Sequence, residues 1–167
     1  EEVTQLSATL VSPTQDLQPA SVFNLDYQIT NHQPSGWSGL TATNILFEVT
    51  IPVGFNVSGL PASCAMNETL LSCTIPSMNP GQSTTLSLQA TLDLATARTT
   101  PLFVLDGQLI DDGPSLDPQT AFSTLLVVSD VDDDGAGDGK QEEEEDGGYG
   151  EEKKLSYFAF KYKTISF

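Results

Sequence analysis

Apolar and polar residues alternate along most of the first 129 residues. The clearest segment is residues 21–31, in which every second side chain from position 23 to position 29 is apolar. Because successive side chains of a strand point to opposite faces, this alternation predicts strands with one apolar and one solvated face. The pattern is repeated in residues 44–51 and 84–94, and more weakly in residues 6–11, 55–57, 70–75, 102–110 and 122–128.

Turn-forming residues separate these segments. Prolines and glycines recur between them at intervals of about 8–15 residues, and no stretch has helical periodicity over three turns. Seven or eight short strands spaced in this way predict an all-β fold, an immunoglobulin-like antiparallel sandwich of two sheets over residues 3–129. We expect Pro13, Pro52 and Pro76 to break strands or to protect their edges.

The chain is strongly acidic. Its 167 residues include 6 Lys and Arg against 23 Asp and Glu, a formal net charge of −17. Direct binding to nucleic acid needs clustered basic residues, so this charge argues against it, and it argues equally against binding to an anionic membrane surface. No apolar run is long enough to span a membrane, and the first residues do not have the pattern of a signal peptide.

The charge is unevenly distributed, and it divides the chain near residue 129. Residues 1–129 contain 11 acids and one base, Arg98, whereas residues 130–167 contain 12 acids and five lysines. Like charges among glycines repel, so residues 130–152 are expected to form an acidic, extended and largely disordered linker. The basic and aromatic residues 153–167 are of uncertain origin: an added strand, an anchoring or sorting tail, and a non-native tail from a shifted reading frame all remain open.

The only two cysteines, Cys64 and Cys73, are separated by eight residues. This spacing suits a hairpin whose arms are cross-linked, and an even cysteine count suggests an oxidising compartment. The alternative is a pair of free, buried thiols in a cytosolic protein. We predict a Cys64–Cys73 disulfide and no zinc site, since zinc needs further Cys or His ligands.

Several short motifs occur in a recognisable order. One strand ends at Asn31, a second closes in the sequence Ile-Pro-Val-Gly-Phe at residues 51–55, a Cys pair follows, and an Asn-Pro-Gly turn at residues 79–81 precedes the next strand. In this order the chain resembles the conserved-repeat β-sandwich family of prokaryotic surface proteins, known as domain of unknown function eleven. The loop at residues 31–39 is longer than is usual in that family, and a fainter likeness exists to the calf-type sandwiches of integrin α chains.

The resemblance implies an extracellular module, secreted or on the cell surface, and bacterial in our interpretation. Modules of this family often stand in tandem, so the expected partners are neighbouring domains of a larger surface protein, with a protein or glycan ligand as a further candidate. The family carries no catalytic residues, and none are assigned here. We therefore expect a non-enzymatic structural or adhesion module that acts as a spacer.

A spaced set of aspartates begins the acidic segment, at Asp130, Asp132, Asp134 and Asp138. Calcium prefers six to eight oxygen ligands, which alternate Asp side chains in a tight loop can supply. The pattern resembles thrombospondin type-three and dockerin-type calcium loops, but Gln141 stands where those loops place a bidentate Glu. The segment is either a calcium-binding linker that stiffens an interdomain junction or a solvated acidic spacer.

The long loop at residues 31–39 carries Trp37, the only tryptophan, and His32, the only histidine. An exposed aromatic ring can anchor a sugar or a protein partner, so Trp37 is a candidate ligand-binding residue. The alternative is that Trp37 caps one end of the core. His32 has no sequence neighbour that forms a nucleophile pair with it, and we expect it to face solvent.

Overall fold

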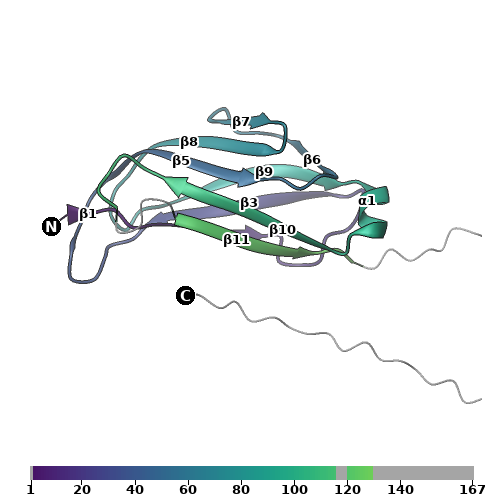
Figure 1. Cartoon of the computed structure of the whole chain (residues 1–167), viewed down its shortest axis with the longest axis horizontal. Coiled ribbons are helices and arrows are strands. Elements are labelled where there is room, and N and C mark those ends of the chain that lie inside the picture. The colour runs from purple at the N-terminus through teal and green to yellow at the C-terminus, as the bar shows by residue number, and fades with distance from the viewer. Residues whose placement is uncertain (1, 116–119, 130–167) are drawn as a thin grey trace, which may run out of the picture. The chain divides into compact units, whose positions relative to one another are not determined.

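The computed structural model describes residues 2–115 and 120–129, and it is a sandwich of two antiparallel sheets with one short helix (Figure 1). One sheet has the strand order β11-β10-β5-β8-β7 and the other has the order β2-β3-β9-β6, while β1 and β4 form a small parallel pair. The predicted all-β sandwich is confirmed. The elements are β1 (Glu2–Val3), β2 (Leu6–Ser12), β3 (Val22–Asn31), β4 (Ser38–Gly39), β5 (Ala42–Thr50), β6 (Phe55–Ser58), β7 (Cys64–Asn67), β8 (Leu70–Met78), β9 (Ser83–Leu92), α1 (Leu94–Thr99), β10 (Leu102–Ile110) and β11 (Thr120–Val127).

Strand β3 shows how the alternating pattern becomes the core. Leu25, Tyr27 and Ile29 are fully buried between the sheets, whereas the residues between them lie on the outer face. β3 is central in its sheet, where it pairs with β2 on one side and with β9 on the other. The strand β10 has the bounds that the alternation predicts, and most of the other expected strands differ by one to three residues at their ends.

The predicted strand over residues 84–94 is wrong at its end. β9 stops at Leu92, and the chain turns into α1. Asp93 caps this helix, because its side chain accepts hydrogen bonds from the Thr96 backbone N–H at 3.0 Å and from the Thr96 hydroxyl at 3.2 Å. A helix of six residues is too short to show three turns of periodicity, which is why the sequence pattern does not reveal it.

Pro76 does not end a strand, as was expected, but lies inside β8. The ladder between β5 and β8 pairs Thr43 with Ser77 and Ile45 with Ile75, and omits the position between them. Proline has no N–H to give to a ladder, and the opposite residue, Asn44, adopts a left-handed backbone with φ of 50°. The local irregularity at Asn44 lets β8 continue through the proline.

The strands β2 and β11, which belong to different sheets, run in the same direction. Two parallel bridges join the segments that flank them, Thr4 with Ser115 and Leu17 with Val128. The N-terminal strand β1 lies at one end of the sandwich, and β11 points toward the other end, beside α1 (Figure 1). Among the described residues, no helix is long and apolar enough to cross a membrane.

Three aromatic rings form the centre of the core. The ring centroid of Tyr27 lies 5.0 Å from that of Phe47 and 5.7 Å from that of Phe122, and the last two rings are stacked 5.4 Å apart. The Phe122 ring covers Gly107, its partner across β10 and β11. Within the described part of the chain, the buried Tyr27 hydroxyl has no hydrogen-bond partner, and burial raises its pKa well above the ordinary value.

Replacing Tyr27 with phenylalanine is expected to stabilise the domain by about 1 kcal/mol at pH 7, because the variant no longer buries an unpartnered hydroxyl. The unfolded chain loses the tyrosine proton above about pH 10, while the folded chain retains it. The free energy of unfolding of the wild type should therefore fall by up to about 1.4 kcal/mol per pH unit above that point, relative to Tyr27→Phe. Urea unfolding between pH 7 and 11 measures both effects, and parallel pH curves for the two proteins would contradict the second.

Candidate functional site

Asn31 organises the end of the sandwich at which the chain begins. Its fully buried side chain donates from Nδ2 to the backbone oxygens of Leu40 and Met78, each at 2.9 Å, and its Oδ1 accepts from the Gln5 N–H at 3.3 Å. Its backbone N–H and oxygen bond to Gln82 and Gly81 in the turn before β9. One amide group thus ties β3, β8, the long loop and the residue that precedes β2 together.

The loop between β3 and β5 carries Trp37, whose side chain is 41% exposed. Its next residues, Ser38 and Gly39, form β4 and pair with β1. The Gln33 side chain donates to the Trp37 backbone oxygen at 3.4 Å, and the Leu40 N–H donates to the Val3 oxygen at 2.9 Å. The Trp37 indole is therefore exposed on a loop that backbone hydrogen bonds hold in place, and Trp37 is not one of the buried core residues.

His32 has a partner that the sequence did not indicate. The Ser7 Oγ lies 2.7 Å from His32 Nε2, and the His32 N–H donates to the Gln5 oxygen at 2.7 Å. The two side chains are 25 residues apart and meet because β2 pairs with β3. A serine beside a histidine is the core of many nucleophilic sites, which also need a group that orients the histidine and donors for an oxyanion. The sequence carries no signal for this pair, because the register between two strands cannot be read from it.

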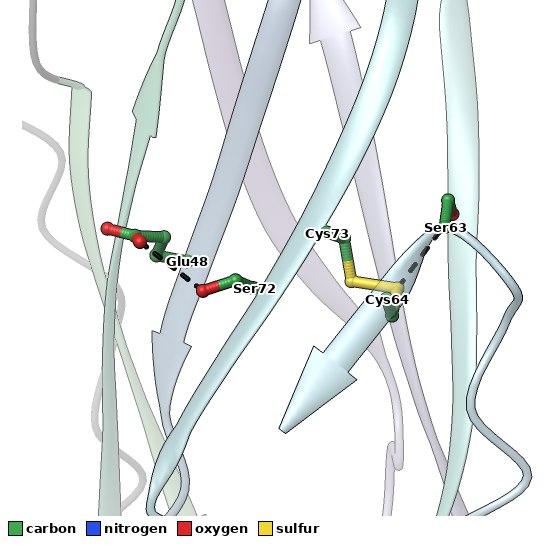
Figure 2. Close-up of a disulfide and its surroundings, with 5 residues drawn as sticks. All are labelled: Glu48, Ser63, Cys64, Ser72 and Cys73. Atoms are coloured by element: carbon green, nitrogen blue, oxygen red, sulfur yellow. Dashed lines mark hydrogen bonds between the residues drawn. A yellow bond between two sulfur atoms is a disulfide. The ribbon is translucent and has the colours of Figure 1, made fainter. Parts of the chain in front are cut away.

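The predicted disulfide is present, between Cys64 on β7 and Cys73 on β8 (Figure 2). The two cysteines are direct partners in the ladder, with Cα atoms 4.0 Å apart, and Cys73 is fully buried. Next to Cys73, the Ser72 hydroxyl donates to Glu48 Oε1 at 3.3 Å (Figure 2). Glu48 Oε2 accepts from the Gln108 side chain at 2.7 Å, so this carboxylate is held by two neighbouring strands.

An apolar patch lies on the outer face of β10 and β11. It consists of two directly opposed pairs, Leu102 with Val127 and Val104 with Leu125, and each of these four side chains is between 40% and 50% exposed. The outer face of β3 in the other sheet is polar instead, with Asn24, Asp26, Gln28 and Thr30. Contiguous exposed apolar side chains of this kind are typical of contact surfaces.

The candidate calcium ligands Asp130, Asp132, Asp134 and Asp138 lie outside the described residues, as do the linker 130–152 and the tail 153–167. Within residues 2–115 and 120–129, no three or more His, Cys, Asp or Glu side chains form a group that could hold a metal ion. The calcium-binding linker therefore stays a prediction.

Neither a protein-family model nor a curated protein matches the sequence. Solved structures match it in fold. BcpA, the major pilin subunit of Bacillus cereus in a point-variant form, is 10% identical, with a TM-score of 0.52 over 75% of this chain and 40% of the pilin chain. A FixG-related protein from Vibrio parahaemolyticus is 12% identical, with a TM-score of 0.34 over 75% of this chain and 96% of its own. AvmM, which catalyses macrocyclization in alchivemycin A biosynthesis, is 6% identical, with a TM-score of 0.48 over 78% of this chain and 92% of its own.

The likeness to the pilin subunit shows the fold alone. The pilin subunit supports a β-sandwich, and this chain spans less than half of the pilin chain's length. The other two TM-scores are below 0.5 and carry no argument. The family resemblance stated from the sequence motifs is an expectation that these matches leave open.

Proposed function

We propose that this chain is a non-enzymatic structural or adhesion module of a larger cell-surface or secreted protein. The observation that carries the proposal is the placement of the first and last described strands: β1 lies at one end of the sandwich, while β11 points to the other (Figure 1). A module with this geometry joins its neighbours in a line and separates them by its own length. The Cys64–Cys73 disulfide supports an oxidising location outside the cytosol.

Labelling of intact cells tests the location. An antibody against residues 2–129 should label intact cells of the source organism or its culture medium, and native protein should contain no free thiol. Permeabilised cells and a cytosolic marker protein serve as controls. Labelling that requires permeabilisation, together with two titratable thiols, would show a cytosolic protein and refute the proposal.

The Ser7–His32 pair provides the test of the non-enzymatic part. A panel of ester, amide and glycoside substrates should give no turnover above background with the wild type. Hydrolysis that disappears in both Ser7→Ala and His32→Ala, but persists in the nearby surface variant Thr9→Ala, would make the pair a catalytic site and overturn the proposal.

A second candidate function is binding of a carbohydrate or protein through Trp37. The observation that favours it is the half-exposed indole on a loop fixed by Asn31, Gln33 and the β1–β4 pair. Trp37 is the only tryptophan, so its fluorescence reports contact directly. A glycan array and a protein partner screen should give hits that Trp37→Ala loses and that Val53→Ala, a variant of another exposed apolar loop residue, retains; a blank wild-type result would count against this function.

A further inference from the structure

The strands β2 and β11 lie side by side and run in parallel, each at one edge of a different sheet. β2 is one of the two edge strands of the four-stranded sheet, and β11 is one of the two edge strands of the five-stranded sheet. At the end of the sandwich near α1, the Leu17 N–H donates to the Val127 oxygen at 2.8 Å. The Leu17 oxygen accepts from the Ser129 N–H at 3.0 Å and from the Ser129 hydroxyl at 3.1 Å. At the end of the sandwich where β1 lies, the Thr4 N–H donates to the Pro114 oxygen at 3.1 Å.

Each terminal strand is also held along its length by an antiparallel ladder. β2 pairs with β3 from Leu6 opposite Asn31 onward, and β11 pairs with β10 from Thr120 opposite Leu109 to Val127 opposite Leu102. Hydrogen bonds of an antiparallel ladder lie across the strands. A pull along a strand therefore stresses its ladder bonds together, whereas a pull that opens one end of a ladder breaks them one after another.

The placement of β1 and β11 decides which of these modes applies. β2 begins shortly after β1, which lies at one end of the sandwich, and β11 points toward the opposite end (Figure 1). Tension applied before β2 and after β11 therefore pulls β2 lengthwise along β3 and β11 lengthwise along β10. The same tension loads the hydrogen bond between Leu17 and Val127.

We propose that the sandwich is a tension-bearing module, in which the β2–β3 ladder, the β10–β11 ladder and the Leu17–Val128 bridge resist end-to-end force in shear. This inference rests on the proposed structural role in a surface protein and extends it to a mechanical one. It predicts that resistance to force depends on the pulling direction and on the terminal strands, and not on the overall free energy of unfolding alone.

Single-molecule stretching of the full chain tests this inference. Handles at the two chain ends should give an unfolding force at least about twofold higher than handles at Ser35 and Gln82, because forced unfolding follows the barrier along the direction pulled. Gln82 accepts from the Asn31 N–H, Ser35 follows Asn31 by four residues in the sequence, and pulling at these positions peels β5 from β8 starting at the Ala42–Met78 pair. Equal forces in the two geometries would overturn the proposal.

A matched pair of core variants separates mechanical from thermodynamic strength. Leu126→Ala in β11 and Leu71→Ala in β8 each truncate a buried leucine, and urea unfolding measures how much stability each one loses. Leu126→Ala should lower the end-to-end force more than Leu71→Ala does at an equal loss of stability. Forces that track stability alone would refute tension bearing. That result would leave the surface location, which cell labelling measures separately, unaffected.

Discussion

Replacing Asn31 with leucine is expected to cost about 3 kcal/mol or more in the free energy of unfolding. Leucine has nearly the same shape as asparagine, but it leaves the Leu40 and Met78 oxygens and the Gln5 N–H without their partner in a buried site. Since single domains are stable by about 5–15 kcal/mol, this loss is a large fraction of the total. Urea unfolding at pH 7 measures the change.

The same substitution should release the loop that carries Trp37. Amide hydrogen exchange over residues 32–41 is expected to accelerate more than exchange in β9, and tryptophan emission should shift toward that of a solvated indole. Asn24→Leu on the outer face of the same strand is the matched control, with an expected change of less than about 0.5 kcal/mol. Equal effects of the two variants would show that Asn31 does not organise this end of the sandwich.

Replacing Gly107 with alanine is expected to destabilise the domain by about 3 kcal/mol. A Cβ atom at this position would lie 2.5 Å from the Glu48 backbone oxygen and would overlap the Phe122 ring. The backbone of β5 cannot move away without breaking its pairing with β10, and the ring is held by its stacking on Phe47. Thermal or urea unfolding of the variant measures the loss.

Two comparisons make the Gly107 prediction specific. Gly36→Ala has open space around its new methyl group and only a left-handed backbone to accommodate, so it should cost about 1 kcal/mol. Adding Phe122→Leu to Gly107→Ala should restore part of the loss but not all of it, since the contact with Glu48 remains. A Gly107→Ala protein as stable as the wild type would contradict the packing described for β10.

The strands could be predicted because their signal is local. Alternation from Phe23 to Ile29 needs only neighbouring residues and the pleat of a strand. The helix α1 and the passage of β8 through Pro76 could not, because each depends on a single contact or backbone distortion, at Asp93 and at Asn44. The Cys64–Cys73 pairing was predictable, since only two cysteines exist and their spacing suits a hairpin.

The residues that shape the candidate sites depend on register, which the sequence does not reveal. Ser7 meets His32, and Asn31 meets Leu40 and Met78, through pairings between distant strands. The sequence motif places Asn31 at the end of a strand, but its three side-chain hydrogen bonds form only in the folded chain. The apolar patch likewise arises from the opposition of two strands, although each strand alone looks like an ordinary alternating segment.

The disulfide also fastens β7, one of the two edge strands of the five-stranded sheet. β7 is only four residues long, and Cys64 holds it against residues 70–73 of β8, which would otherwise form an uncovered edge. Long open borders recruit strands from other molecules, and short ones do so poorly. Chemical reduction of the Cys64–Cys73 bond is therefore expected to leave the core intact and still promote aggregation. A secreted protein that loses this bond should lose solubility before it loses its fold.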